Sequence, residues 1–344
     1  MVGNDCHVVS GEAKLLSPGQ IRPSDRIITC YPPLQQILSS LPLYARSELP
    51  VLLLGEPGTG KELVAEALWQ LSPRRSQPFL RTNCATFMES LATSELFGHL
   101  QGSFTDARRS RSGKFKQAHG GTLFLDEVGD LPLSVQPRLL RAVEQGEIEP
   151  VGADTPIRVD VRLVAASNQD LPSLIAQARF RQDLYDRLAV LLLQLPPLRE
   201  RGEDVLLLAS HFAQDAVRLN GREGLVRFTP AAARRLQQHH WPGNVRELRN
   251  VITRAVLFST GAEIRERDLS FTFQPSGLAM PALIPRVTEL TSRPGRAQLE
   301  ELLLQEGGNI SALSRRLRVC SKTIYRWLNS HHIDLMQIRA APGG

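Results

Sequence analysis

The sequence predicts an α/β fold built on a parallel β-sheet, followed by two helical regions. Three observations support this fold class. Between residues 27 and 202, short apolar runs alternate with longer segments of helical periodicity, which is typical of a parallel sheet with connecting helices. From 203 to 273 the pattern is helical throughout. After a stretch rich in Pro, Gly and Ser, a compact helical region occupies 298–344.

Five apolar runs in the first region predict the strands of the sheet. They are rich in β-branched residues and Leu and show little polar alternation, which is typical of strands buried on both faces. The predicted strands are VLLLG (51–55), FLRTNC (79–84), GTLFLDE (121–127), VRLVAAS (161–167) and VLLLQL (190–195).

Three amphipathic segments predict the helices of the second region. The segment TPAAARRLQQHH begins with Thr229 and Pro230, a favourable pair at the N-cap and the first helical position. Residues 1–26 show no periodicity, so we expect a flexible arm there. The composition of 274–297 predicts a linker.

Composition excludes several classes of protein. The apolar runs are too short to span a membrane, and the N-terminus lacks the apolar core of a secretory signal. Four scattered cysteines without a CxxC pair argue against a disulfide framework and a zinc site, and they fit a reducing cytoplasm. The net charge of +6 favours a polyanionic partner, although charge alone is weak evidence.

The segment GEPGTGKE follows a predicted strand and precedes a predicted helix, which is the context of a phosphate-binding P-loop. Its glycines allow backbone N–H groups to turn toward phosphate oxygens, and Lys61 supplies a positive charge. Glu62 replaces the Ser or Thr that usually binds magnesium. The alternative is a Gly-rich turn without a chemical role, which the flanking strand and helix disfavour. The predicted nucleotide-binding residues of the loop are Gly55, Glu56, Pro57, Gly58, Thr59, Gly60, Lys61 and Glu62.

Two acids end the third predicted strand. Asp126 is placed to hold Mg²⁺ and Glu127 to orient an attacking water. Paired acids at a strand end are often only a solvated loop start, but the upstream P-loop favours the catalytic interpretation. The two elements together predict a nucleotide hydrolase.

These motifs give the chain a specific resemblance. GEPGTGKE, SELFGH, GGTLFLDEVGDL, FRQDLYDRL and WPGNVREL resemble the AAA+ ATPases that activate the sigma-54 form of bacterial RNA polymerase, the bacterial enhancer-binding proteins. The similarity is greatest to members that lack an N-terminal receiver domain, and Glu62 itself is typical of the family. The resemblance implies a AAA+ ATPase subdomain at 27–202, a helical lid subdomain at 203–273 and a C-terminal DNA-binding domain at 298–344. It also implies ATP and Mg²⁺ as cofactors and a hexameric ring.

The resemblance assigns roles to further polar residues. Asn83 matches a switch asparagine that interacts with the catalytic Glu, and Arg246 matches the sensor II arginine of the lid. Ser167 and Asn168 match sensor I, where the family more often has Thr before the Asn. Without the resemblance, Asn and Ser at a strand end are commonly helix caps.

Arg181 and Arg187 match paired arginine fingers, which reach the nucleotide of the neighbouring subunit. Arginines near acids are usually surface ion pairs worth little free energy. Phosphoryl transfer, however, needs cations around the transition state beyond Lys61. A finger acting in trans also requires assembly, and a head-to-tail interface either closes into a ring or continues indefinitely. The ring is the form that we expect.

Residues 309–331 resemble the Fis-type helix-turn-helix that ends most members of the family. Apolar residues recur at helical spacing on two predicted helices, and between 311 and 329 the segment is basic without acids. The alternative is a small helical hairpin with a solvated basic face. The residues predicted to read DNA are Ser321, Lys322, Thr323, Tyr325 and Arg326.

The family's polymerase-contacting loop reads GAFTGA, and this chain has GSFTDA at 102–107. Phe104 and Thr105, the expected contact tip, are retained, and Ser103 is a mild change. Asp106 is not mild, because it removes backbone freedom and adds an acid beside the tip. The predicted loop comprises Gly102, Ser103, Phe104, Thr105, Asp106 and Ala107.

Three functions follow from these observations. The first is a cytoplasmic activator that binds DNA upstream of promoters and hydrolyses ATP to remodel the closed complex of sigma-54 RNA polymerase. The second is a DNA-binding AAA+ regulator that does not act through sigma-54, which Asp106 leaves open. The third is a AAA+ remodeller or unfoldase with a basic helical tail, which the motifs disfavour. Residues 1–26 leave no room for a receiver domain, so we expect control by a separate protein, by expression level or by partner subunits.

Overall fold

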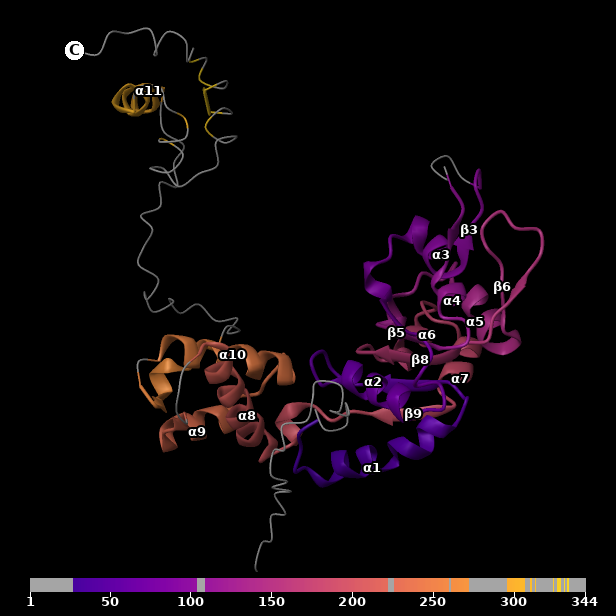
Figure 1. The fold of residues 1–344 in the computed structure, drawn as a ribbon, viewed down its shortest axis with the longest axis horizontal. Helices are drawn as coiled ribbons and strands as arrows, with labels where there is room; N and C mark the ends of the chain where they lie inside the picture. Colours follow the sequence, from indigo (N-terminus) through magenta and orange to yellow (C-terminus); the bar gives the residue numbers. More distant parts are fainter. Residues whose placement is uncertain are drawn as a thin grey trace, which may run out of the picture. The chain divides into compact units, whose positions relative to one another are not determined.

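The computed structural model describes residues 27–103, 109–221, 226–259, 261–271 and 296–306, with the single residues 310, 313, 324, 327, 328, 331 and 333. The chain forms two compact units, Met1–Phe273 and Gln274–Gly344 (Figure 1). The predicted arm at 1–26, the contact-loop residues 104–107, most of the linker and the predicted DNA-reading residues lie outside the described residues.

The first unit contains the predicted parallel sheet. Its five strands lie in the order β2-β5-β8-β1-β9, and every neighbouring pair is parallel. The sequence prediction of all five strands is confirmed, with ends that differ by one residue or so. The strands are β1 (Val51–Leu54), β2 (Phe79–Asn83), β5 (Thr122–Asp126), β8 (Arg162–Ser167) and β9 (Leu191–Gln194).

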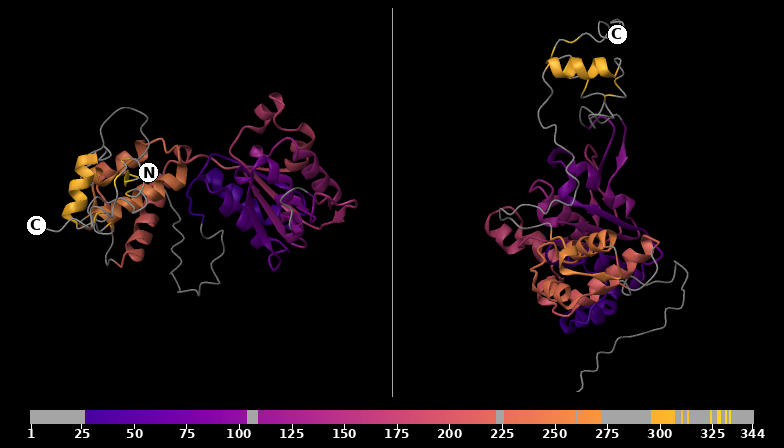
Figure 2. Two further views of the ribbon diagram at one scale, coloured as in Figure 1. Left: turned by 90° about the horizontal axis from the view of Figure 1, so that it is seen from above. Right: turned by 90° about the vertical axis from the view of Figure 1, so that its left-hand side faces the viewer.

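Helices cover both faces of this sheet (Figure 2). Alternate residues of β1 point to opposite faces: Leu53 belongs to the core with α1 (Pro32–Arg46) and α2 (Lys61–Leu71), whereas Leu52 belongs to the core on the other face. Strands buried on both faces explain why these runs are continuously apolar. The helices on the second face are α3 (Glu89–Phe97), α4 (Lys114–Gln117), α5 (Gln136–Gln145), α6 (Leu171–Ala176) and α7 (Gln182–Leu188).

Two short antiparallel pairs project from the sheet and contact each other. The pair β3 (Gly98–His99) and β4 (Arg111–Ser112) forms the stem of the contact loop, and β6 (Glu147–Ile148) pairs with β7 (Ile157–Arg158). Val151, between β6 and β7, donates its N–H to the carbonyl of Gly98 at 2.9 Å and accepts from the N–H of Leu100 at 3.0 Å. The two projections are therefore joined through the main chain.

The helical lid completes the first unit. Its helices α8 (Asp204–Leu219), α9 (Pro230–Gln238) and α10 (Asn244–Phe258) pack around the buried Trp241. The predicted cap of α9 is confirmed, since Thr229 Oγ1 accepts a hydrogen bond from the N–H of Ala232 at 3.3 Å. A parallel pair, β10 (Arg227–Phe228) with β11 (Glu263–Ile264), flanks the helices.

Within the described residues, four short 3₁₀ turns connect these elements. They are η2 (Cys84–Thr86), η3 (Val128–Asp130), η4 (Leu198–Glu200) and η5 (Glu266–Asp268). Two of them follow strand ends that carry polar residues: η2 follows β2, and η3 follows Glu127.

The second unit has a small apolar core of its own. Helix α11 (Arg296–Gln305) begins within the stretch predicted as linker. The apolar residues predicted to line the two helices of the DNA-binding domain contribute to this core where they are described. Its buried members are Leu299, Leu303, Ile310, Leu313, Ile324 and Leu328. Among the described residues, no helix is both long enough and apolar enough to span a membrane.

Candidate nucleotide site

The P-loop joins the end of β1 to the start of α2. Gly58 and Gly60 both have positive φ, +79° and +105°, a conformation that costs glycine little. A Cβ atom at Gly58 would lie 2.4 Å from the carbonyl oxygen of Gly243 and 3.1 Å from Cβ of Arg246. Glycine at position 58 therefore allows the lid to approach the P-loop closely, and it places the predicted sensor II arginine beside the loop.

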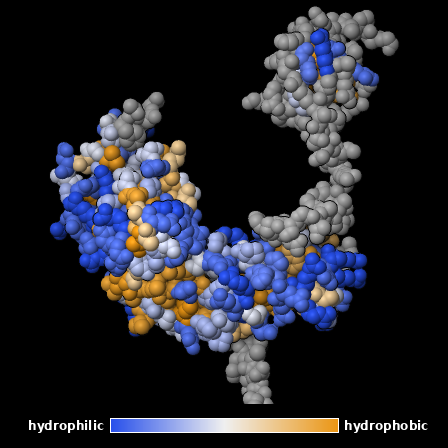
Figure 3. All heavy atoms as spheres, turned by 180° about the vertical axis from the view of Figure 1, so that it is seen from behind, coloured by the Kyte–Doolittle hydropathy of each residue, from blue (hydrophilic) through white to orange (hydrophobic). Residues whose placement is uncertain are grey.

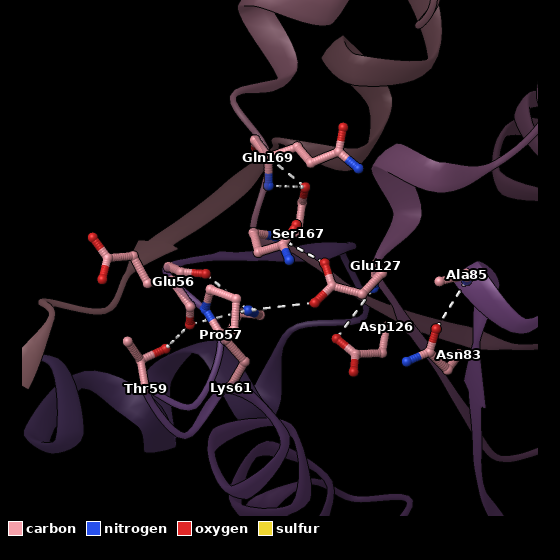
Figure 4. A network of polar contacts seen from close by, with 12 residues as sticks. Glu56, Pro57, Thr59, Lys61, Asn83, Ala85, Asp126, Glu127, Ser167 and Gln169 are labelled. Atoms are coloured by element: carbon pink, nitrogen blue, oxygen red, sulfur yellow. Dashed lines mark hydrogen bonds and ion pairs between the residues drawn. The ribbon is translucent and has the colours of Figure 1, made fainter. Parts of the chain in front are cut away.

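Lys61 is the first residue of α2, and its side chain is only 7% exposed. Its Nζ donates to the carbonyl of Gly55 at 2.8 Å and lies 3.9 Å from Oε1 of Glu127 (Figure 4). Burial lowers the pKa of Lys61, while the charges of Glu127 and Asp126 act in the opposite direction. Glu62 follows Lys61, but its exposed side chain pairs with Arg81 of β2 at 2.6 Å.

Asp126 and Glu127 stand at the end of β5. Asp126 Oδ1 accepts from the N–H of Glu127 at 3.1 Å, and Glu127 Oε2 accepts from the N–H of Asn168 at 3.0 Å (Figure 4). Glu127 has left-handed backbone angles, φ 54° and ψ 50°, which are uncommon for a residue other than glycine. Burial is the main cause that raises the pKa of both carboxyl groups, and Lys61 opposes it. The hard carboxylate oxygens of Asp126 fit a Mg²⁺ ion.

The predicted sensor I residues end β8, next to β5 in the sheet. Ser167 is fully buried, and its Oγ accepts from the N–H of Gln169 at 3.0 Å. The Gln169 side chain donates to Asp130 Oδ1 at 2.5 Å. These bonds join the ends of β5 and β8, and Asn168 contributes through its main chain.

Asn83 ends β2 and pairs in register with Asp126. Its Oδ1 accepts from the N–H of Ala85 at 2.9 Å, so it caps the turn η2 (Figure 4). Within the described residues, the Asn83 side chain is bonded to its own turn rather than to Glu127. Its assignment as a switch stays a prediction.

The two predicted finger arginines lie at the two ends of α7. Arg181 is the N-cap residue and donates to the carboxylate of Asp183 at 2.6 and 3.0 Å. Arg187 in the last turn donates to Glu144 of α5 at 2.5 Å. The exposed fractions of their side chains are 45% and 59%, so both guanidinium groups are accessible to a second molecule.

Several residues around the site were missed by the sequence analysis. Arg199 of η4 donates to both carboxylate oxygens of Glu56 in the P-loop. Asn244, the first residue of α10, donates to Glu56 at 3.0 Å and to the carbonyl of Pro57 at 3.1 Å. The buried Arg201 donates to the carbonyl of Thr59 at 3.0 Å. The motif PPLRER contains Arg199 and Arg201. Its charged residues are equally compatible with a solvated turn, so the sequence alone did not indicate a contact with the P-loop.

An apolar pocket adjoins the P-loop at Thr59 and Gly60. Its walls come from the segment before α1, from α2 and from the lid. Asp204, buried at the start of α8, fixes the segment before α1. Its carboxylate accepts hydrogen bonds from Thr29 Oγ1 and from the N–H of Cys30, both at 2.6 Å. An apolar pocket with few polar groups suits a flat nucleotide base. Its apolar lining residues are Ile27, Ile28, Leu34, Leu63, Val64, Leu195, Leu208 and Val245.

Of the predicted contact loop, the structure describes Gly102 and Ser103. Ser103 Oγ donates to the carbonyl of Leu100 at 2.7 Å. A Cβ atom at Gly152, in the segment between β6 and β7, would lie 2.7 Å from Cβ of Ser103. The stem therefore packs tightly against this segment.

Comparisons with known proteins agree with this geometry. Residues 27–194 match the family described as the Sigma-54 interaction domain, and residues 199–282 match the AAA+ ATPase lid domain. The chain is 42% identical over 320 residues to the transcriptional regulatory protein ZraR of Escherichia coli, covering 92% of this chain and 70% of ZraR. It is also 42% identical over 332 residues to the anaerobic nitric oxide reductase transcription regulator NorR of Shigella flexneri, covering 92% of this chain and 65% of NorR.

Among solved structures, NtrX from Brucella abortus in complex with ATP superimposes with a TM-score of 0.67 at 29% identity. That match covers 89% of this chain and 70% of NtrX. The chain thus spans roughly two thirds of the length of each of these relatives.

Proposed function

The chain belongs to the sigma-54-dependent activators of the AAA+ ATPases, and from this membership we propose that it hydrolyses ATP to remodel the closed complex of sigma-54 RNA polymerase. The observation that carries the proposal is the convergence of the ends of β5 and β8 on the P-loop. Lys61, Asp126, Glu127 and the Asn168 main chain lie within one bonded network. Such a network is suited to phosphoryl transfer, which depends on positioning and charge.

Each residue of the network has a distinct task. The P-loop N–H groups and Lys61 bind the phosphates, and the apolar pocket beside Gly60 takes the base. Asp126 is the residue that would hold Mg²⁺, which supplies neutralising charge when it is bound. Glu127, fixed by the Asn168 N–H, orients the attacking water. Arg246 approaches the P-loop from the lid.

The proposed active form is a ring, in which Arg181 and Arg187 complete the site of the neighbouring subunit. Two features of the surface support this proposal. Both arginines are accessible. Apolar side chains also gather on the surface of the α/β subdomain (Figure 3). The large apolar side chains that are exposed on this subdomain include Leu43 of α1 and Leu192 of the edge strand β9. Exposed apolar surface of this kind marks sites of protein association. The number of six subunits follows from the family.

The proposed output is the loop at 102–107, whose Phe104 and Thr105 touch the sigma factor. The match of residues 27–194 to the Sigma-54 interaction domain supports sigma-54 contact over a regulator that acts without it. DNA binding belongs to the C-terminal unit, through Ser321, Lys322, Thr323, Tyr325 and Arg326. We place the protein in the cytoplasm, where RNA polymerase and the promoter are.

In vitro transcription with purified sigma-54 polymerase tests this function. Wild type, Phe104→Ala and Asp106→Gly are compared on a cognate promoter, and the ATPase rate is measured in parallel. We expect wild type to form open complexes, and Phe104→Ala to hydrolyse ATP without forming them. If wild type hydrolyses ATP without opening the promoter while Asp106→Gly succeeds, the proposed contact with sigma-54 is refuted.

A further inference from the structure

Gln136, the first residue of α5, has a side chain that the nucleotide site described above does not use. It is a polar residue with no exposed surface. A buried amide is costly unless its donors and acceptor are bonded. The hydrogen-bond partners of the Gln136 side chain therefore indicate its structural role.

The hydrogen bonds of the Gln136 side chain go to main-chain groups of two segments, one just before α5 and the other far along the chain, just before α7. Its Nε2 donates to the carbonyl of Leu131 and to the carbonyl of Arg179, both at 3.0 Å. Its Oε1 accepts from the N–H of Arg181 at 2.9 Å. The amide thus fixes the backbone on both sides of Phe180, directly before the finger residue Arg181 at the start of α7.

The main chain just before Arg181 has an unusual conformation that these hydrogen bonds stabilise. Ala178 has a positive φ of 53°, and the N–H groups of Arg179 and Phe180 both donate to the carbonyl of Leu174. The chain thus makes a tight turn immediately before the finger. Phe180 is buried in the core beneath the sheet, and the Gln136 amide bonds the flanking main-chain groups on either side of it.

The other bond of Gln136 reaches the segment that follows the catalytic Glu127. Leu131 is the C-cap residue of η3, which begins directly after Glu127. One side chain therefore connects the strand end that serves a subunit's own nucleotide with the finger that serves its neighbour's nucleotide.

We propose that Gln136 is a positioning residue for Arg181, an inference that rests on the proposed function. Gln136 fixes the position of the arginine finger and thereby governs hydrolysis in the adjacent subunit. Catalysis is sensitive to placement, and a displacement of about 1 Å can lower a rate on the order of 100-fold. Replacing the amide by an apolar side chain of similar length leaves the main-chain groups beside Arg181 without their partner. The loss should then appear in kcat, while ATP binding in the variant subunit is unchanged.

The variant Gln136→Met tests this role, with Gln145→Met as the matched control. Gln145 is an exposed residue on the same helix, so its replacement repeats the chemical change away from the finger. For Gln136→Met we expect kcat to fall on the order of 10- to 100-fold, with an unchanged Kd for a non-hydrolysable ATP analogue. Gln145→Met should match wild type in both measurements. Assays are run well below the thermal unfolding midpoint of each variant.

Subunit mixing separates a role in trans from a role in the same subunit. Gln136→Met subunits retain their own P-loop but present a displaced finger, whereas Lys61→Ala subunits lack a working P-loop but present intact fingers. Mixing the two should restore ATP hydrolysis, as it should for Arg181→Ala mixed with Lys61→Ala. The rescued rate should follow the fraction of Gln136→Met sites that adjoin a Lys61→Ala subunit.

Several outcomes would overturn the assignment. If Arg181→Ala is rescued and Gln136→Met is not, Gln136 serves its own subunit. Loss of ATP-analogue binding by Gln136→Met would show the same. A failure of the proposed function is distinguishable from these results, because wild type would then hydrolyse no ATP or Arg181→Ala would leave the rate unchanged.

Discussion

Arg199 and Glu56 form a two-bond ion pair between η4, the turn that leads into the lid, and the P-loop. Arg199 Nη1 lies 2.8 Å from Glu56 Oε2, and Nη2 lies 2.6 Å from Oε1. The hydrogen bond from Arg199 is the main cause that lowers the pKa of Glu56, and the bond from Asn244 acts in the same direction. The pair thus fixes the entry of the lid against the loop that binds phosphate.

Removal of this pair should weaken ATP binding more than it slows hydrolysis. The Arg199 side chain is 40% exposed, so the interaction is worth about 0.5–1 kcal/mol. We therefore expect Arg199→Ala to raise the KM for ATP about two- to fivefold with little change in kcat. Steady-state ATPase assays measure both values. Arg158→Ala, which removes an exposed pair with Glu147, is the matched control, and an equal KM in the two variants would contradict the prediction.

Asp126 should reduce the stability of the nucleotide-free protein at neutral and alkaline pH. Burial raises its pKa in the folded state, so the folded protein binds this proton more tightly than the unfolded chain does. The ionised carboxylate therefore costs stability above the folded pKa, and the cost disappears as pH falls. Asp126→Asn removes the charge and should raise Tm by a few degrees at pH 8, since about 1 kcal/mol corresponds to about 2–4 °C in a domain of this size.

The measurement is thermal unfolding without nucleotide from about pH 4 to about pH 8, because the unfolded carboxyl group titrates at about pH 4. The Tm difference between Asp126→Asn and wild type should be largest at the alkaline end and should shrink toward the acid end. Asp154→Asn replaces an exposed acid and should show no such trend. The same Asp126→Asn protein should lose ATP hydrolysis, as expected where function costs stability. A Tm gain that does not change with pH would contradict the assignment to this carboxyl group.

Sequence patterns predicted the sheet and the phosphate-binding elements because both leave local signals. Buried strands are continuously apolar, as in β1 and β8, and the P-loop combines a strand, glycines and a lysine within a few positions. Arg199, Asn244 and Gln136 left no such signal. Their partners lie far away in the chain, and a single polar residue at a helix start fits a cap as well as a tertiary contact. The fold had to bring the segments together before their roles could be inferred.

Gly152 should affect the output of the ATPase without affecting hydrolysis. It has a φ of +82°, and an added Cβ would lie 2.7 Å from Ser103 Cβ in the stem of the contact loop. Gly152→Ala should cost about 1 kcal/mol or more and displace the stem. Open-complex formation should fall while the ATPase rate stays near that of wild type.

Gly221→Ala provides the control for backbone strain alone. Gly221 also has a positive φ, +61°, but an added Cβ would meet nothing within 4 Å. It should leave open-complex formation unchanged. Equal losses in both variants would mean that strain, rather than the clash with Ser103, explains the effect of Gly152→Ala.

The basic residues of the C-terminal unit should divide into two kinds in DNA binding. Arg326 is predicted to read bases, so Arg326→Ala should relax sequence preference at one position by about 1–3 kcal/mol. Arg316 belongs to the same basic stretch but precedes the residues predicted to read bases, so we expect it to contact phosphate. Arg316→Ala should then weaken binding to all sequences and lower the salt slope by about 1. Binding titrations at several salt concentrations, on cognate and scrambled DNA, measure both effects. Identical changes in the two variants would refute this division.

The clamp that Asp204 places on Thr29 and Cys30 has a practical consequence for anyone who handles the protein. A module joined directly to residue 27, in place of residues 1–26, is tethered to the wall of the pocket proposed for the base. An affinity tag, a fluorescent reporter or a grafted sensory module at that junction would pull on the same few hydrogen bonds that shape the pocket. The site is therefore a poor place for a silent tag and a good one for a ligand-responsive input.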